Sequence, residues 1–172
     1  FFWNVMMPSY LKERFTAVYD LEATKRGYGL QQYQGRITLG SGGVFGKGLS
    51  SDNLLTTTPE LYNDMMFAHI GQVFGFVGCL LVVLWIVLLC MRLLQNARHS
   101  EDALGNFICV GVFAVLFFQS VINIGMVLCV FPVIGITLPL LSAGGSSVLS
   151  TYLCLGLAVS VHNHTHKSTL FQ

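Results

Sequence analysis

The feature that most constrains this chain is an apolar run from residue 65 to residue 91, which contains no Lys, Arg, Asp or Glu. A helix needs about 20 mostly apolar residues to cross the hydrocarbon core of a bilayer. This run therefore predicts a membrane-spanning helix. Two further runs, 105–131 and 138–161, have the same character. The sequence thus predicts an all-α polytopic membrane protein with three transmembrane helices.

Charged residues are scarce, which excludes most soluble classes of protein. The chain is 53% hydrophobic and 10% charged, with nine Lys and Arg against eight Asp and Glu, whereas soluble globular domains are typically about 25% charged. The near balance of charge gives no reason to expect a nucleic-acid partner. Five cysteines lie inside the apolar runs at spacings that match neither a zinc site nor a disulfide framework. We interpret them as small hydrophobic residues and predict no metal site.

The basic residues predict which way the spans cross the membrane. Arg92 and Arg98 follow the first apolar run and Lys167 follows the third, whereas 132–137 contains no Lys or Arg. Because short loops rich in Lys and Arg remain in the cytoplasm, we expect 8–64 to face outward. The predicted order is the end of a transmembrane helix (1–7), a large extracellular loop with interfacial helices (8–64), a transmembrane helix (65–91), a cytoplasmic loop (92–104), a transmembrane helix (105–131), an extracellular loop (132–137), a transmembrane helix (138–161) and a cytoplasmic tail (162–172).

Helices are also predicted inside the extracellular loop. Ser9 is a suitable cap for a surface helix in which apolar residues recur at helical spacing. A second short element is expected at 30–39. Pro59 and Glu60 are expected to open a helix that carries Asp64.

Asp64 is the last acid before the first apolar run. A carboxylate at the edge of a membrane is costly unless it meets water, a cation or a substrate, so its position makes it a candidate for chemistry. The alternative is an acid at a helix N-terminus, which the helix dipole stabilises by about 0.3–1 kcal/mol. His69 and Gln72 would continue a polar face along the same helix, which indicates a polar cavity beside it.

Residues Gly40 to Gly48 contain five glycines and one lysine, Lys47. Glycine lets backbone amides approach an anion closely and lysine adds a positive charge, so this loop is a candidate phosphate or pyrophosphate site. It is not a Walker loop, because Gly48 stands where Ser or Thr is required. A flexible turn is the alternative interpretation.

Polar groups in the later spans have simpler interpretations. Gln119 and Asn123 lie four residues apart and predict hydrogen bonds between helices. The prolines and glycines between Pro132 and Ser147 interrupt the start of the third span, as is typical where irregular backbone lines a polar cavity. The alternating histidines from His162 onward indicate an exposed basic tail rather than a metal site.

Several of these segments together resemble the SEDS family of RodA, FtsW and SpoVE, and the likeness covers nearly the whole chain. The order and spacing of the motifs make the likeness strong, although each motif alone is modest. The motifs are Gly40-Ser41-Gly42-Gly43-Val44-Phe45-Gly46-Lys47-Gly48-Leu49, Pro59-Glu60 with Asp64-Met65-Met66-Phe67-Ala68, Asn123-Ile124-Gly125-Met126, Pro132-Val133-Ile134-Gly135-Ile136-Thr137-Leu138-Pro139 and Ser142-Ala143-Gly144-Gly145-Ser146-Ser147.

The resemblance implies the C-terminal part of a membrane protein of about ten spans, in the bacterial cytoplasmic membrane. It implies a peptidoglycan glycosyltransferase that polymerises lipid II outside the membrane, alongside a class B penicillin-binding transpeptidase. It also implies that Asp64 is the essential acid. The stretch from Phe118 to Met126, with Gly135 and Ile136, is slightly more similar to RodA than to FtsW.

The chain also departs from the family pattern. Tyr62 and Asn63 replace a usual His-Thr pair before the acid, and Ala143 stands where an aromatic residue is common. Gln72 and Val73 replace a Glu-Glu pair. Without the glutamates, the polar packing of this helix is expected to differ from that of the family. The binding of any cation that the pair helps to hold is expected to differ as well.

These observations predict a mechanism in which Asp64 is the base for the acceptor hydroxyl of a glycosyl transfer. Lys47 and Arg36 are the predicted positive charges for the departing pyrophosphate, with donors near Ser41, Gly42 and Gly43 and room for a divalent cation, Mg or Mn. Two rivals remain, a lipid II flippase and a non-catalytic scaffold for the transpeptidase. A flippase is expected to bury charge near the membrane midplane, whereas every acid here lies in a loop or at a membrane edge, which favours the enzyme.

Overall fold

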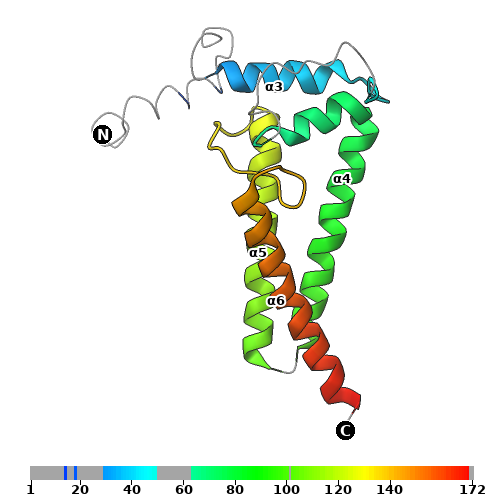
Figure 1. Cartoon of the computed structure of the whole chain (residues 1–172), viewed down its shortest axis with the longest axis vertical. Coiled ribbons are helices and arrows are strands. Elements are labelled where there is room, and N and C mark those ends of the chain that lie inside the picture. The colour runs from blue at the N-terminus through cyan, green and yellow to red at the C-terminus, as the bar shows by residue number, and fades with distance from the viewer. Residues whose placement is uncertain (1–13, 15–17, 19–28, 50–62, 101, 171–172) are drawn as a thin grey trace, which may run out of the picture.

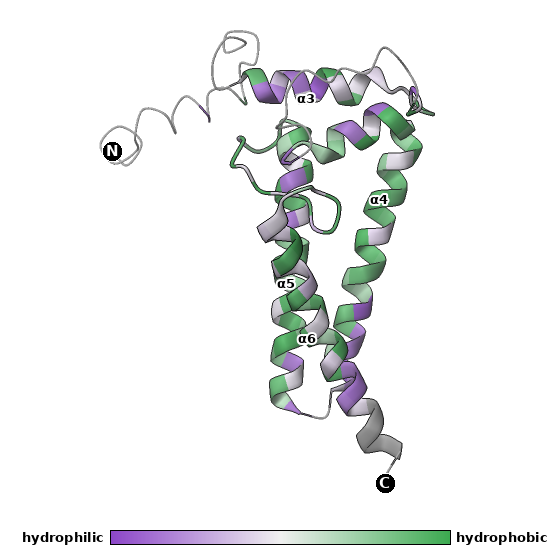
Figure 2. Cartoon of the chain, in the orientation of Figure 1, coloured by the Kyte–Doolittle hydropathy of each residue, from purple (hydrophilic) through white to green (hydrophobic). Residues whose placement is uncertain are grey.

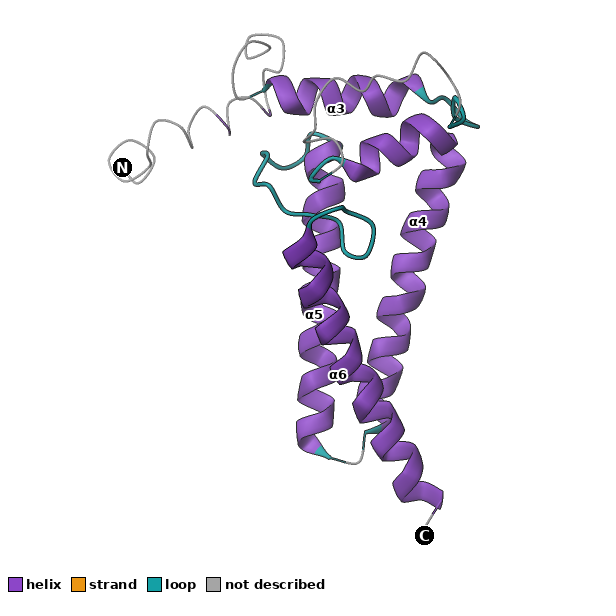
Figure 3. Cartoon of the chain, viewed as in Figure 1, coloured by secondary structure: helices purple, strands orange, loops and turns teal. Residues whose placement is uncertain are grey.

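The computed structural model describes residues 14, 18, 29–49, 63–100 and 102–170, with side chains described as far as 165. The regular elements named within those residues are all helices, as Figure 3 shows. They are α3 (Leu30–Ser41), α4 (Met66–His99), α5 (Ala103–Val127) and α6 (Gly145–Leu170). Within the described residues, three helices are long and apolar enough to cross a membrane: Met66–His99, Ala103–Val127 and Gly145–Thr165. The predicted all-α fold with three candidate spans is therefore confirmed.

The three long helices form the body of the structure, and α3 lies across one end of it (Figure 1). Two apolar clusters hold these elements together. One lies near α3 and joins the start of α4 to Val127, Val133 and Leu138. The other lies near the opposite end and joins Leu93 of α4 to Cys109 and other residues of α5 and α6. Figure 2 shows that the long helices are mostly apolar while hydrophilic residues are frequent on α3.

The ends of the helices differ from the predicted boundaries. α4 continues to His99, so most of the predicted loop 92–104 is helical. Leu93 and Ala97 explain this extension, because both are buried against α5 and keep this end of α4 packed. α5 ends at Val127 instead of residue 131, and the helix expected to leave the membrane near residue 161 continues to Leu170.

The third span begins at Gly145 instead of residue 138. Leu140 has a positive φ of 66°, which a right-handed helix does not accommodate. The Leu138 amide donates instead to the Ser142 hydroxyl at 2.7 Å. The expected interruption of this segment is thus present, and it removes the first two turns of the predicted helix.

The short element predicted at 30–39 is confirmed as α3. The predicted surface helix at Ser9, the helix end at 1–7 and the helix opening at Pro59 and Glu60 lie outside the described residues, apart from Arg14 and Val18, which are helical. Asp64 itself lies in a turn directly before α4.

Helix α4 is broken at Gly75, whose φ of 69° and ψ of −163° only glycine adopts readily. In a continuous helix the Gln72 and Val73 carbonyls would accept from the amides of Phe76 and Val77. They accept instead from the Lys47 amide at 2.9 Å and the Gly48 amide at 3.0 Å. The break therefore leaves two helical amides to be satisfied elsewhere.

The glycine-rich loop also supplies the acceptors for the two amides that the break leaves without a helical partner. The Phe76 amide donates to the Gly43 carbonyl at 2.9 Å, and the Val77 amide donates to the Val44 carbonyl at 3.2 Å. We call the four hydrogen bonds between residues 43–48 and 72–77 the kink clasp. They replace the two missing helical bonds, so the loop is part of the hydrogen bonding of α4. Neither interpretation of the loop from sequence predicted this role.

The end of α5 carries a residue type that fits its conformation poorly. Cys129 has a φ of 60°, and its amide donates to the Met126 carbonyl at 3.2 Å while the Val130 amide donates to the Gly125 carbonyl at 2.8 Å. This pair of bonds is the Schellman motif, in which glycine is strongly preferred at the residue with positive φ.

We therefore predict that Cys129→Gly raises the free energy of unfolding by about 1 kcal/mol, because glycine adopts this conformation without strain. Thermal unfolding in detergent measures the change. Cys154→Gly is the control, because Cys154 lies inside helix α6, where glycine is expected to cost about 1 kcal/mol. A lower unfolding temperature for Cys129→Gly would contradict the prediction.

Candidate active site

Asp64 is half-buried and lies directly before α4, whose first part lies beside α3 (Figure 1). The loop between α5 and α6 passes close to its carboxylate: a Cβ atom built on Gly135 would lie 3.4 Å from Asp64 Oδ2. Gly135 has a φ of 79°, so a larger residue would be strained here, and its Cβ atom would be in van der Waals contact with the acid. The carboxylate is thus bordered by backbone with no intervening side chain at this position.

Asn123 joins the two segments that meet at Asp64. Its side chain is fully buried near the end of α5. Its Nδ2 donates to the Asp64 backbone carbonyl at 2.8 Å and to the Ile136 carbonyl at 2.6 Å. The sequence predicted hydrogen bonds between helices for this residue. The structure instead gives it bonds from a helix to a turn and to a loop.

Two more polar side chains hold the loop that follows α5. Gln32 of α3 is buried, and its Nε2 donates to the Met126 carbonyl at 3.1 Å and the Phe131 carbonyl at 2.9 Å. Arg14 donates from Nη1 to the Val133 carbonyl at 2.8 Å. The sequence did not predict that Gly135 borders the acid, nor that Gln32 and Arg14 bond to the backbone of the loop after α5. The glycine between Pro132 and Pro139 was the available signal, since it marks a loop whose backbone approaches another group closely.

The residues predicted to bind the pyrophosphate lie on α3 and in the kink clasp. Both cations are exposed: Arg36 lies on α3, and the Lys47 amide bonds to Gln72 of α4. The Arg36 charge lowers the pKa of the Cys129 thiol while burial raises it more strongly, so Arg36 lies near the turn after α5. Burial is the larger effect, and the pKa of that thiol is raised overall.

The donors expected near Ser41 and Gly42 are used within the chain. The Ser41 hydroxyl donates to the Thr38 carbonyl at 2.8 Å, and the Gly42 amide donates to the Leu39 carbonyl at 3.4 Å. Gly43 is exposed, and its carbonyl accepts from α4. The Lys47 backbone lies against Gln72, which is eight residues beyond Asp64 and therefore about 12 Å along a helix. Joint binding of one anion by these residues stays a prediction.

The place of Gln72 beside His69 suggested that it lines an open polar cavity, but it does not. It has no exposed surface, and neither atom of its amide has a hydrogen-bond partner among the described residues. The residue that replaces a family glutamate is therefore enclosed in the packing between α4 and its neighbours. His69 is half-buried.

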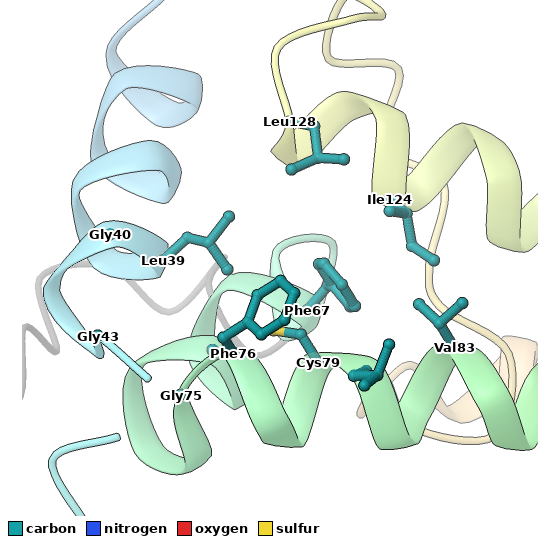
Figure 4. Close-up of a pocket in the computed structure, with 12 residues that line it drawn as sticks. Leu39, Gly40, Gly43, Phe67, Gly75, Phe76, Cys79, Val83, Ile124 and Leu128 are labelled. Carbon is teal, nitrogen blue, oxygen red and sulfur yellow. The ribbon is translucent and has the colours of Figure 1, made fainter. Parts of the chain in front are cut away.

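An apolar cavity of about 340 Å³ lies between α3, the break in α4 and the end of α5. Figure 4 shows the side chains of Leu39, Phe67, Phe76, Ile124 and Leu128 directed toward it from these three helices. Phe67, in the first turn of α4, comes three residues after Asp64, so one lining residue is close to the acid in the chain. Its lining suits an apolar chain and offers no charge to a pyrophosphate.

Within the described residues, no group of three or more His, Cys, Asp or Glu side chains is arranged to hold a metal ion. Mg²⁺, however, is commonly held by one or two carboxylates together with substrate phosphates. Asp64 supplies one such carboxylate, which fits a cation shared with a bound pyrophosphate.

Comparison with known proteins places this arrangement in context. The chain is 34% identical to peptidoglycan glycosyltransferase MrdB of Escherichia coli K12 and to stage V sporulation protein E of Bacillus subtilis, covering 94% of this chain and 44% of each relative. It is 34% identical to the probable peptidoglycan glycosyltransferase FtsW of Haemophilus influenzae, covering 100% of this chain and 44% of that protein. The three identities are equal and do not separate these relatives.

A solved structure concerned with structural coordination of polymerization and crosslinking by a peptidoglycan synthase complex matches the fold. The TM-score is 0.75 at 29% identity, and the match covers 95% of this chain and 44% of the solved one. The present chain thus spans less than half the length of the relatives it matches. The family model described as a cell cycle protein of FtsW, RodA and SpoVE matches residues 1–167. With its motifs, its helices and its sequence all in agreement, the chain belongs to the FtsW, RodA and SpoVE family.

Proposed function

We propose that the protein containing this chain is a peptidoglycan glycosyltransferase that polymerises lipid II at the outer face of the bacterial cytoplasmic membrane. The observation that carries the proposal is the half-buried Asp64 carboxylate. It lies beside Gly135 and directly before a helix that is long and apolar enough to span a membrane. A lipid-linked sugar presents its reacting atoms at this depth, where its pyrophosphate meets water. The names of the relatives support the same reaction class.

In the proposed reaction, Asp64 accepts the proton of the acceptor's 4-hydroxyl as that oxygen attacks the anomeric carbon of the donor sugar. A new carbon–oxygen bond forms while the bond to the lipid pyrophosphate breaks, and the pyrophosphate leaves with both bonding electrons. Lys47 and Arg36 stabilise the negative charge that develops on the leaving group. One carboxylate suffices because the diphosphate needs no proton to leave.

The remaining predicted ligands have smaller parts in this proposal. The amide of Gly43 is a candidate donor to the pyrophosphate. The Ser41 hydroxyl could donate to it only by releasing the Thr38 carbonyl, and Gly42 supports the loop by its close packing. A divalent cation, Mg or Mn, would add charge neutralisation when shared between Asp64 and the pyrophosphate. No step above depends on it. The apolar cavity beside Phe67 offers space for the first part of the lipid chain.

We also propose that the protein works beside a class B penicillin-binding transpeptidase, with 8–64 outside the cell. The similarity to a peptidoglycan synthase complex that couples polymerization and crosslinking supports this partner. The basic residues Arg92 and Arg98 at the far end of α4, with His99 beside them, support a cytoplasmic location for that end.

The positions of the acids favour an enzyme over a flippase. Among the described residues, the carboxylates are Asp64 before α4 and Asp102 before α5, at opposite ends of the bundle. None of the three candidate spans carries an acid in its described part. A transporter of a charged lipid headgroup is expected to place ionisable groups inside the membrane instead.

The proposal is tested with the complete protein reconstituted in vesicles that contain fluorescent lipid II. We expect glycan polymer, resolved by gel electrophoresis, to form at the face that carries residues 8–64. A quencher outside the vesicles measures transbilayer movement of the lipid in the same sample. Movement of lipid II without polymer would replace the enzyme with the flippase, and neither signal, with transpeptidase binding retained, would favour the scaffold.

A further inference from the structure

We propose that Asn123 is a positioning residue for Asp64, which sets the distance between the acid and the loop that borders it. This inference rests on the proposed function for its kinetic consequence. Its structural part stands on two hydrogen bonds, from Asn123 Nδ2 to the Asp64 carbonyl at 2.8 Å and to the Ile136 carbonyl at 2.6 Å. The residue lies on α5, 59 positions from the acid.

The chemistry of the two partners fixes how the amide is oriented. Both are carbonyl oxygens, which only accept hydrogen bonds, so the NH₂ group must face them and each of its two protons serves one carbonyl. No other neutral side chain of this size offers two donors from one atom. An aspartate in the same place could donate to neither carbonyl and would add a charge beside them.

The two bonded carbonyls belong to the two segments that meet at the acid. One belongs to Asp64 itself, and the other belongs to Ile136, the neighbour of Gly135. Because Gly135 approaches Asp64 Oδ2, any change in the separation of these two segments changes the room around the carboxylate. Asn123 is fully buried and sits on a regular helix, so it is a rigid reference point for both.

The other atom of this amide adds a second observation. Asn123 Oδ1 is buried without a hydrogen-bond partner among the described residues. An unsatisfied buried acceptor costs stability, so a side chain retained only for packing would be expected to be apolar here. The two hydrogen bonds that the side chain donates explain why asparagine stands at this position.

The chain contains a matched comparison in Gln32. Its amide also bridges two carbonyls, those of Met126 and Phe131, and its side chain is 1% exposed. It holds the same loop but contacts neither the Asp64 turn nor residues 135–137 through these bonds. Removing the Gln32 bridge should therefore lower stability without moving the acid. Removing the Asn123 bridge should lower stability and also move the acid.

The first measurement is independent of activity. Hydrogen exchange of the complete protein, followed by mass spectrometry, is compared for wild type, Asn123→Ala and Gln32→Ala. We expect Asn123→Ala to accelerate exchange in residues 63–66 and 133–137 together, and Gln32→Ala to accelerate it in residues 126–131 while leaving 63–66 unchanged. Unchanged exchange in 63–66 for Asn123→Ala would overturn the proposal, even if the protein polymerises no glycan.

The second measurement separates positioning from general loss of structure. We expect Asn123→Ala to lower kcat for lipid II polymerisation by about 100-fold with a KM within about threefold of wild type, since a small displacement of a reacting group has effects of this size. Gln32→Ala should keep wild-type kcat per folded molecule. Ser120→Ala should match wild type in both measurements, because among the described residues the Ser120 hydroxyl bonds within its own helix, to the Leu116 carbonyl.

A second variant covers the case in which Asn123→Ala does not fold. Asn123→Leu keeps the branching at Cγ, fills the site with a larger side chain and removes both donors, and the same split between kcat and KM is expected of it. Equal losses of kcat in the Asn123 and Gln32 variants at equal unfolding temperatures would reduce Asn123 to a structural role. Absence of polymer from the wild-type protein would instead overturn the proposed function and leave the exchange result to decide the positioning.

Discussion

The variant Asp64→Asn is expected to lose lipid II polymerisation by at least about 100-fold when it replaces the wild-type residue in the complete protein. Asparagine has the same size and shape but accepts no proton, and general base catalysis commonly contributes about 10²–10⁴-fold in rate. The Asp64 backbone carbonyl, which Asn123 binds, is unchanged by the substitution. The loss should therefore fall on kcat, with the unfolding temperature near that of wild type.

Asp102→Asn is the matched control for this variant. Asp102 is exposed at the opposite end of the bundle, directly before α5, and its side chain makes no capping hydrogen bond to the helix. Its replacement should leave polymerisation unchanged. Normal glycan chains from Asp64→Asn would remove the base from the proposed mechanism and return Asp64 to the role of an acid near a helix N-terminus.

The variant Gly42→Ala is expected to lower the free energy of unfolding by about 3 kcal/mol, the upper end of the usual cost of overpacking. A Cβ atom on this residue would overlap the Gly71 backbone carbonyl of α4. Gly42 has a φ of −77°, which any residue adopts, so the cost arises from the contact and not from the backbone conformation. Relief of the overlap requires α3 to move away from α4, which also strains the kink clasp.

Gly40→Ala is the control two residues away. Its Cβ would meet no atom within 4 Å and the residue lies inside helix α3, so alanine should raise stability by up to about 1 kcal/mol. A thiol-reactive dye that reports the exposure of buried Cys79 and Cys109 on heating measures both variants in detergent. Equal unfolding temperatures for the two variants would show that the packing of α3 on α4 is looser than the contact implies.

The position of Asp64 was predictable from the sequence, whereas the residues that contact its turn were not. Asp64 was identifiable because the membrane boundary is visible in the sequence, and a charge at that boundary is costly wherever the chain folds. Asn123 was visible only as a polar residue in a span. Its partners, Asp64 and Ile136, could not be predicted because the choice among acceptors depends on which turn and loop reach the end of α5.

The glycine-rich loop has a conspicuous sequence pattern, but that pattern did not predict its structural role. Its composition suggested an anion site or a flexible turn, and both interpretations considered the loop alone. The amides of Lys47 and Gly48 and the carbonyls of Gly43 and Val44 bond to α4, because the break at Gly75 leaves backbone groups that must find partners. No local pattern near residue 45 indicates that a helix 30 residues later will be broken.

The sequence by itself determined that this protein is helical, that three segments are suited to span a membrane, and that Asp64 lies where the first of them begins. These properties follow from hydrophobic length and from the cost of charge in a bilayer, and both are local. The tertiary structure alone decided that residues 43–48 complete the hydrogen bonding of α4 and that Asn123 holds the Asp64 turn against the loop at Ile136. These pairings join residues far apart in the chain, and they are selected by packing, since each buried backbone group must find a partner among whatever segments the fold brings within reach.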